Sequence, residues 1–229
     1  MAAAARRSGT ARMSRGARAG SRGVPRAVRE PQMLDVATRV FAERGFHAAG
    51  MDEIASEVGV TKPLVYSYFG SKEGLFAACV ARVNAALREE LTRTLKPVKD
   101  PEVRMWTGIR TLFNWIDGNR EAWRLFMQAT AAGVGPLLAE VNRARSDMVA
   151  TIRALIEESA AALGIGENLG PEIDAMSEAF VAANVAIANH WLADHPEESA
   201  DHQALRVMNF VWIGLGGMAE RRLWLPPGP

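Results

Sequence analysis

Residues 51–72 read MDEIASEVGVTKPLVYSYFGSK and are the most informative part of this chain. Ile54, Ala55 and Val58 lie three to four residues apart, which places them on one apolar stripe of a short helix. Gly59 follows as a residue that readily adopts the left-handed conformation that ends a helix. A second short helix comes directly after this turn. Two short helices joined in this way are typical of a helix-turn-helix, which places its second helix in the major groove of DNA.

The second helix of the motif is predicted to begin after Thr61, a good N-cap residue. Val65 and Phe69 lie four residues apart and are expected to face inward. The outward face is unusual for a helix that only meets solvent, because it carries Leu64, Ser67 and Tyr68, with Lys62 at its leading end. Ser71 is predicted to cap a following helix. Lys72 and the first N–H groups of that helix would then form a phosphate site.

Residues 33–79 resemble the DNA-binding domain of the TetR/AcrR family of bacterial transcriptional regulators. The landmarks are AxxxFxxxGF before the motif and then IAxxxGV, VYxYF and SKExLF, with no gap between them. Short helices joined by Gly-Val also occur in helical proteins that bind no DNA, and the continuous match favours DNA binding. The resemblance implies an all-α homodimer of about nine helices, with an N-terminal three-helix head and a larger helical domain that binds a ligand and makes the dimer.

The resemblance also assigns roles to residues of the motif. It implies that bases are approached by Lys62, Pro63, Leu64 and Ser67. It implies that phosphates are held by Thr61, Tyr66, Tyr68 and Lys72. Two positions depart from the family pattern: Gly50 stands where Ser or Thr usually caps the first motif helix, and Gly74 stands where a capping-box Glu is usual. Both departures are expected to loosen the head slightly.

Composition narrows the classes of function. The chain has 229 residues, of which 48% are apolar, so it can bury a sizeable core. Sustained alternation of period two is absent, which argues against a sheet. The single Cys79 excludes an internal disulfide, fits a cytoplasmic protein, and is interpreted as a buried thiol rather than a redox switch. The four histidines form no metal-binding pattern, and no nucleophile or phosphate-loop motif is present, so we expect no enzyme activity, catalytic residue, metal or cofactor.

The formal net charge of +1 conceals an uneven distribution. Residues 1–26 hold seven arginines and no acidic residue. Residues 27–91 hold seven basic and nine acidic residues, so the proposed DNA-binding head is slightly acidic. The first 26 residues are expected to be disordered. Three interpretations of this tail stay open: an organelle transit peptide, an inert extension or misplaced start, and an arm whose arginines neutralise DNA phosphates.

We therefore divide the chain into a disordered Arg-rich tail (1–26), a helix-turn-helix domain (27–87, with the motif at about 50–69) and an effector-binding and dimerisation domain (88–225). In the last of these, helices are expected over about 101–117, 119–132, 136–163, 171–194 and 200–224. No apolar run is long enough for a membrane span.

A sensor needs a mostly apolar cavity between helices. Candidates for its walls are Trp106, Phe113, Trp123, Phe126, Met127, Met148 and Met176. Possible polar groups are Asn114, Gln128, Thr130 and Asn184. The last two helices are expected to make the dimer, through Phe180, Ile187, Trp191, Met208, Trp212 and Leu215.

The sequence predicts a ligand-responsive transcriptional regulator. We expect a repressor that binds a palindromic double-stranded DNA operator as a homodimer and is released by a small hydrophobic effector. The alternative is a DNA-binding regulator without a small-molecule effector, controlled by a protein partner or acting as an activator.

Overall fold

The computed structural model describes residues 24–132, 135–162 and 170–219. Over these residues the protein consists of nine helices and no strand, which confirms the predicted all-α fold. In chain order they are α1 (Arg26–Ala48), α2 (Met51–Val58), α3 (Lys62–Phe69), α4 (Lys72–Leu95), α5 (Pro101–Gly118), α6 (Arg120–Ala132), α7 (Gly135–Ala162), α8 (Gly170–Asp194) and α9 (Ala200–Ala219).

The helices of the C-terminal half begin within one residue of the predicted positions. The last predicted helix was expected to reach residue 224, and its final residues lie outside the described part of the chain, as does the Arg-rich tail up to residue 23. Within the described ranges, no helix has the length and apolar character needed to cross a bilayer.

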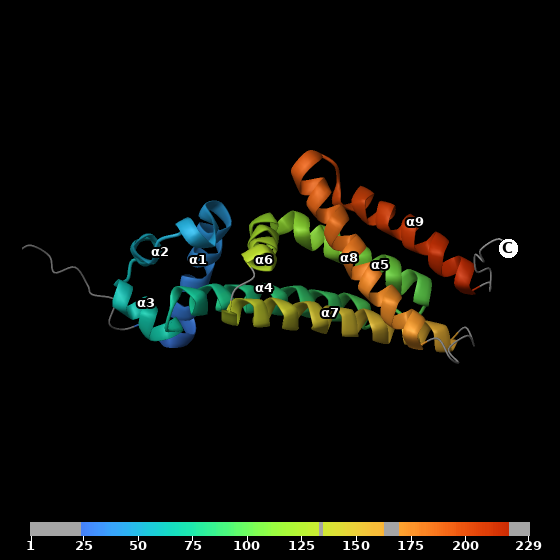
Figure 1. Ribbon diagram of the computed structural model, residues 1–229, viewed down its shortest axis with the longest axis horizontal. Helices are drawn as coiled ribbons and strands as arrows, with labels where there is room; N and C mark the ends of the chain where they lie inside the picture. Colours follow the sequence, from blue (N-terminus) through green and yellow to red (C-terminus); the bar gives the residue numbers. More distant parts are fainter. Residues whose placement is uncertain (1–23, 133–134, 163–169, 220–229) are drawn as a thin grey trace, which may run out of the picture.

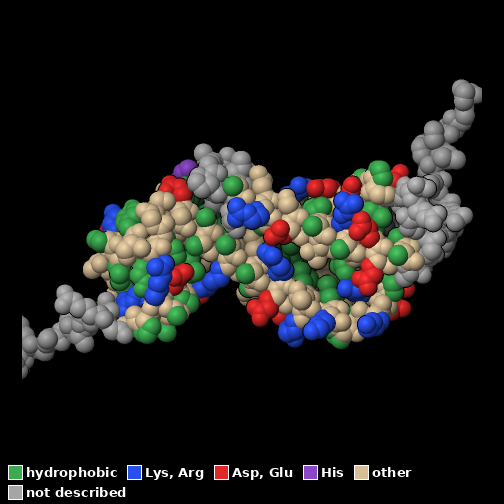
Figure 2. All heavy atoms as spheres, turned by 90° about the horizontal axis from the view of Figure 1, so that it is seen from below, with side chains coloured by type: hydrophobic (Ala, Val, Ile, Leu, Met, Phe, Trp, Pro, Cys, Tyr) green, Lys and Arg blue, Asp and Glu red, His purple; other side chains and the backbone are tan. Residues whose placement is uncertain are grey.

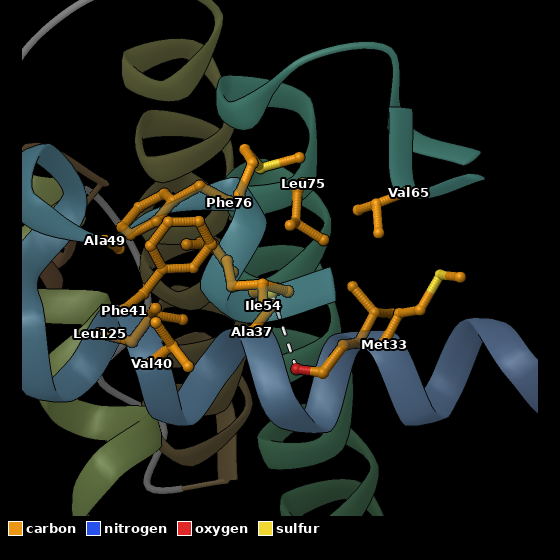
Figure 3. Packing of buried hydrophobic residues seen from close by; sticks show 14 of the residues in the cluster. Met33, Ala37, Val40, Phe41, Ala49, Ile54, Val65, Leu75, Phe76 and Leu125 are labelled. Carbon is orange, nitrogen blue, oxygen red and sulfur yellow. Dashed lines mark hydrogen bonds between the residues drawn. The ribbon is translucent and has the colours of Figure 1, made fainter. Parts of the chain in front are cut away.

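The N-terminal helices α1 to α3 and the start of α4 surround one hydrophobic core, which we call the head core (Figure 3). Phe41 and Phe76 meet edge to face at its centre, with ring centroids 4.9 Å apart. Ile54 of α2 and Val65 of α3 are fully buried in the same core. The apolar stripes predicted for the two motif helices are therefore the faces by which they attach to α1 and α4.

Helix α6 completes the head core although it lies some 80 residues further along the chain than α1. Leu125 and Ala129 are fully buried there, and Figure 3 shows Leu125 next to Val40 and Phe41. The amide of Gln128 adds a hydrogen bond from Nε2 to the carbonyl oxygen of Ala42, at 3.2 Å. The head is thus closed by a helix from the C-terminal half.

A second hydrophobic core, the C-terminal core, lies among α4, α5, α6, α8 and α9. Helix α4 leaves the head and runs alongside α7 toward the far end of the molecule (Figure 1). Helix α5 packs against α9, and α7 also packs against α8. Trp115 and Phe126 contact both cores. The predicted boundary at residue 87 falls inside the continuous helix α4.

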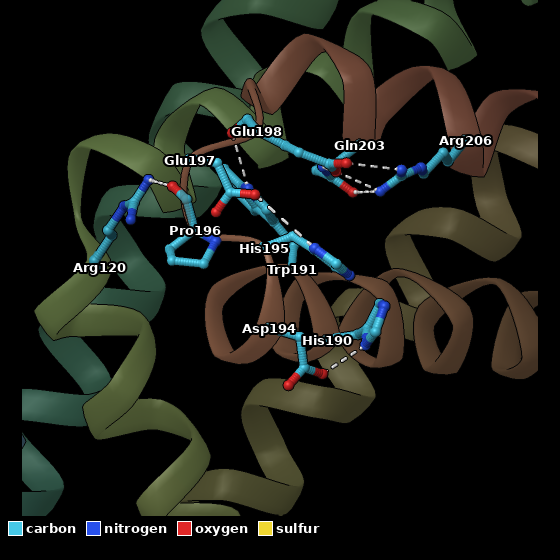
Figure 4. A network of polar contacts seen from close by, with 10 residues as sticks. All are labelled: Arg120, His190, Trp191, Asp194, His195, Pro196, Glu197, Glu198, Gln203 and Arg206. Atoms are coloured by element: carbon cyan, nitrogen blue, oxygen red, sulfur yellow. Dashed lines mark hydrogen bonds and ion pairs between the residues drawn. The ribbon is translucent and has the colours of Figure 1, made fainter.

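The corner between α8 and α9 is fixed by polar contacts to the backbone (Figure 4). Trp191 donates its indole N–H to the carbonyl oxygen of Glu198, at 2.9 Å. Glu198 in turn accepts hydrogen bonds from Arg206 and Gln203 of α9. Arg120 of α6 donates to the carbonyl oxygen of Pro196, at 3.0 Å. These bonds fix the direction in which α9 returns along α5.

Candidate nucleic-acid interface

The turn between α2 and α3 has the geometry of a helix-turn-helix. Gly59 adopts the left-handed conformation, with φ 76° and ψ 32°. The N–H of Val60 reaches the carbonyl oxygen of Ala55 at 2.9 Å, and that of Gly59 reaches Ser56 at 3.1 Å. This pair of bonds is the Schellman arrangement, which satisfies the last carbonyls of a helix. The predicted role of Gly59 is confirmed, and the turn directs the chain into α3.

Helix α3 is anchored by one side and open on the other. Val65 is the one fully buried residue of α3, and half-buried Phe69 packs against the head core beside it. Five of the eight residues predicted to contact DNA are exposed: Thr61, Lys62, Pro63, Tyr66 and Ser67. Thr61 occupies the N-cap position, but its side chain makes no capping hydrogen bond. Leu64 and Tyr68 were predicted to lie on the outward face, but they are half-buried and pack against the head core, because α3 is short and lies close to it.

The start of α4 was predicted to form a phosphate site through Lys72. In the structure, Lys72 also makes two contacts within the head. Ser71 caps the helix as expected, because its Oγ accepts from the N–H of Gly74 at 3.0 Å. Lys72 is half-buried, and its Nζ donates to the carbonyl oxygen of His47 at 3.0 Å and lies 5.0 Å from the centroid of the Phe46 ring. Lys72 therefore ties the end of α1 to the start of α4.

A carboxylate already lies at this helix terminus. Glu73 accepts hydrogen bonds from its own backbone N–H and from the hydroxyl of Ser71, and these bonds lower the pKa of Glu73 below its ordinary value. An anionic side chain at a helix N-terminus is favourable for the helix. A DNA phosphate that approached the same N–H groups would have to displace it.

Arg26, the first residue of α1, lies against α3 and was missed by the sequence reasoning, which assigned it to the tail. Its guanidinium carbon is 4.7 Å from the centroid of the Tyr68 ring, within the range of a cation–π contact. Its Nε also donates to Glu30, at 3.0 Å. Arg26 and Tyr68 are far apart in sequence, so no local pattern could have revealed the contact.

Three acidic residues of α2 form ion pairs with basic side chains of α1 and α3. Glu53 pairs with Arg44 of α1 at 3.2 Å, and Glu57 pairs with Arg39. Asp52 pairs with Lys62 of α3, with 2.8 Å between Oδ2 and Nζ. Figure 2 shows basic and acidic side chains interspersed along the face that it presents. The basic side chains of the head named here are thus paired with carboxylates, as expected for a domain whose net charge is slightly negative.

The predicted sensor residues fall mainly in one place. Phe113 and Trp123 are buried in the C-terminal core, while Trp106, Phe126, Met127 and Met148 pack around it. Met176 is half-buried on α8 and belongs to neither core. Of the possible polar groups, Asn184 is 3% exposed, and its Oδ1 is buried without a hydrogen-bond partner among the described residues. The side chain of Thr130 lies outside the described part of the chain.

The predicted dimer residues divide into three groups. Trp191 is fully buried in the C-terminal core of its own subunit, next to Phe113, so its side chain offers no surface to a second copy. Phe180, Ile187 and Met208 are half-buried and pack against the same core. The side chains of Trp212 and Leu215 lie outside the described part of the chain. The exposed residues of α8 include small ones, Ala175, Ala179, Ala182 and Ala186, beside charged and polar ones such as Glu172, Asp174, Glu178 and His190.

Comparison with known proteins gives a consistent result over nearly the whole chain. Residues 33–79 match the family described as bacterial regulatory proteins, tetR family. Residues 101–214 match the family described as tetracyclin repressor-like, C-terminal domain. The chain is 30% identical over 215 residues to the HTH-type transcriptional activator FasR of Mycolicibacterium smegmatis, covering 94% of this chain and 95% of that protein.

Solved structures agree with this arrangement of helices. A TetR-like transcriptional regulator from Rhodococcus sp. RHA1 is 30% identical and superposes with a TM-score of 0.69, covering 85% of this chain and 99% of that one. The transcriptional regulator FadR of Bacillus subtilis, solved in complex with stearoyl-CoA, has a TM-score of 0.72 at 16% identity, covering 79% and 96% of the two chains. The second likeness concerns the fold alone.

Proposed function

Because this chain belongs to the TetR family of DNA-binding transcriptional regulators, we propose that it binds a palindromic operator as a homodimer and releases or engages it when an apolar effector binds. The observation that carries the proposal is the open side of α3, where Lys62, Tyr66 and Ser67 are exposed while Val65 anchors the helix. Proteins of this family and the relatives of this chain are regulators rather than enzymes. The proposed location is the cytoplasm, where bacterial DNA lies.

In the proposed complex α3 lies in the major groove. Lys62, Pro63, Leu64 and Ser67 approach bases, and Thr61, Tyr66 and Tyr68 contact the sugar-phosphate backbone. Arg26 joins the backbone contacts, since its guanidinium lies over Tyr68 and its side chain is 64% exposed. Lys72 contributes as a fixed charge at the start of α4. Its bond to His47 supports a role in holding α1 and α4 together as well.

The proposed dimer surface is formed by α8 and α9. Reading two half-sites of a palindrome requires two-fold pairing of subunits. The small exposed residues of α8 support close approach of a second helix, and Leu205 and Phe210 of α9 add exposed apolar area. Phe180, Ile187, Met208, Trp212 and Leu215 remain proposed members of this surface.

The proposed effector site lies around the C-terminal core, beside Trp106, Phe113 and Trp123. These side chains favour an apolar molecule, and the free carbonyl oxygen of Asn184 favours one that also carries a hydrogen-bond donor. The stearoyl-CoA bound by the Bacillus subtilis protein of the same fold has both an apolar chain and amide N–H groups. We therefore propose long-chain acyl-CoA as the first ligand class to test.

The bound protein could either repress or activate transcription. Repression relieved by the effector follows from the general family resemblance. Activation is favoured by one observation, the 30% identity to a protein named as a transcriptional activator over 94% of this chain. A reporter gene placed behind the selected operator separates the two, because deleting the regulator raises expression in the first case and lowers it in the second.

The test of the proposal is selection of bound DNA from a random pool by the full-length protein. We expect a palindromic consensus, with half-sites separated by about one or more helical turns of 10–10.5 base pairs. An enriched sequence without two-fold symmetry would contradict dimeric reading, and no enrichment would contradict specific DNA binding.

Operator affinity is then measured with stearoyl-CoA and with coenzyme A, which lacks the acyl chain. A ligand that shifts the operator equilibrium must bind the two states differently, typically with a coupling of about 1–3 kcal/mol, or 5- to 150-fold in affinity. We expect such a change with stearoyl-CoA and none with coenzyme A. If neither molecule changes affinity, the acyl-CoA class is wrong. Other apolar effectors and control by a protein partner would then be tested next.

A further inference from the structure

The carboxylate of Asp52 differs from the other acidic groups of α2 in the helix that it contacts. Glu53 and Glu57 pair with arginines of α1, so they fix α2 to a helix that supports the motif. Asp52 pairs with Lys62, the first residue of the recognition helix α3. Helix α2 therefore places one carboxylate against Lys62, a residue that is expected to approach DNA.

The Asp52–Lys62 pair is close and open to solvent. Its atoms are 2.8 Å apart, and the two side chains are 79% and 44% exposed. The hydrogen bond to Asp52, followed by its negative charge, raises the pKa of Lys62 above its ordinary value, so the amine is fully charged at neutral pH. An exposed pair of this kind is weak and exchanges partners readily. On DNA of arbitrary sequence, where no base partner is matched to Lys62, a phosphate can therefore compete with Asp52 for the same amine.

We propose that Asp52 competes with DNA for Lys62 and thereby limits the affinity of the head for DNA of any sequence. The inference rests on the proposed DNA-binding role of α3. Phosphate neutralisation by lysine and arginine supplies nearly all of non-specific DNA binding. A lysine that is held by a carboxylate contributes less to it, and the carboxylate itself repels phosphates. Asp52 thus weakens the phosphate contacts that Lys62 can make on DNA of any sequence, so that tight binding depends on the remaining contacts of α3 and on the pairing of two heads.

The test measures the affinity of full-length Asp52→Asn for a mixed-sequence duplex of about 30 base pairs, long enough for two half-sites. Loss of an exposed ion pair to a competitor is worth about 2- to 5-fold per protomer. We therefore expect binding at least 2-fold tighter than that of the wild type at about 50 mM salt. The difference in affinity between Asp52→Asn and the wild type should narrow at about 500 mM salt, because exposed charges are screened there.

The matched control is Glu53→Gln, which removes the same charge from the neighbouring residue but frees Arg44 of α1 instead of Lys62. We expect a smaller gain for this variant. The second control repeats Asp52→Asn in a Lys62→Gln background, where the gain should disappear. Thermal unfolding of each variant verifies that the head is intact.

Three results would overturn the proposal: unchanged or weaker binding by Asp52→Asn, an equal gain for Glu53→Gln, or an undiminished gain without Lys62. The last two would mean that a general change of charge, and not release of Lys62, tightens binding. Wild-type binding to the selected operator reports separately on the proposed function. Failure of the Asp52 inference alone would leave that binding in place.

Discussion

Two glycines determine how α3 joins α4. Gly70 has φ 76° and ψ −49°, and the N–H of Ser71 bonds the carbonyl oxygen of Phe69 at 2.9 Å, which is the geometry of a γ-turn. A Cβ added to Gly74 would lie 2.1 Å from that same carbonyl oxygen. The sequence presented Gly74 as a departure from a capping box. The structure gives its reason, since the backbone of Phe69 leaves no room for a side chain.

The first prediction concerns Gly74→Ala. The obstructing atom belongs to the backbone, so the turn must shift, and we expect a loss of about 1–3 kcal/mol in the free energy of unfolding. Gly118→Ala is the matched control, because nothing lies within 4 Å of a Cβ at that position. Denaturant unfolding of the wild type and both variants measures this loss. Equal midpoints would show that the turn accommodates a methyl group without strain.

The second prediction concerns Cys79, which is fully buried on α4 as the sequence indicated. Burial raises the pKa of this thiol to about 12. Because the thiolate is the reactive form, labelling by a thiol reagent at pH 8 should be very slow in the native protein and fast in denaturant. Rapid labelling of the native protein would contradict this burial and would reopen the redox-switch interpretation.

Among the elements, α6 is the one whose role the sequence did not indicate. Its apolar residues were predicted to line an effector site, and Trp123, Phe126 and Met127 do lie in or against the C-terminal core. Leu125 and Ala129, on another side of the same helix, complete the head core. A helix that is apolar on two sides has no single preferred partner. Only the arrangement of α1 and α4 determines which side meets the head.

The third prediction concerns the contact between α5 and α9. Arg110 donates two hydrogen bonds to Asp201, at 2.8 and 3.0 Å, and Asn114 adds a third. These bonds lower the pKa of Asp201 below its ordinary value, with the bond from Arg110 as the largest cause. A carboxyl whose folded pKa lies below its unfolded value stabilises the protein above the unfolded pKa of about 3.9, and this contribution is lost as the pH falls through the folded pKa.

We therefore expect Asp201→Asn to lower the melting temperature at pH 7 by about 1–4 °C, as befits an exposed pair. The difference from the wild type should shrink steadily below about pH 4. Calorimetry over this pH range measures both effects. A difference that stays constant down to about pH 2 would mean that the charge of Asp201 contributes nothing to the contact.

For the whole molecule, the fourth prediction concerns the proposed dimer. Phe210 of α9 is 69% exposed in the single subunit, more than any other large apolar side chain among the described residues. A charge placed in an apolar interface is unfavourable unless it is paired. Phe210→Glu should therefore yield a monomer at micromolar concentration, measured by light scattering, and bind the palindromic operator much more weakly.

Val28→Glu is the control for this experiment, because Val28 is 50% exposed on α1, away from α8 and α9. We expect it to remain dimeric. A dimer that persists in Phe210→Glu would exclude this part of α9 from the interface. A monomeric wild-type protein would contradict the proposed dimer altogether.

Local sequence alone was enough to predict the helices, the turn at Gly59 and the cap at Ser71. These features depend on residues a few positions apart, so spacing and residue type suffice to predict them. The sequence also predicted the burial of Val65 and the exposure of Lys62 and Ser67, whereas Leu64 and Tyr68, expected to face outward, are half-buried. Which side of α8 is exposed depends on the packing of the other helices, since the apolar residues of α8 are spread around it with little periodicity. The tertiary structure also decided that Trp191 is a core residue, that Arg26 lies on Tyr68, and that Asp52 holds Lys62. Each of these contacts joins side chains from different elements, whose positions are fixed only when the helices pack.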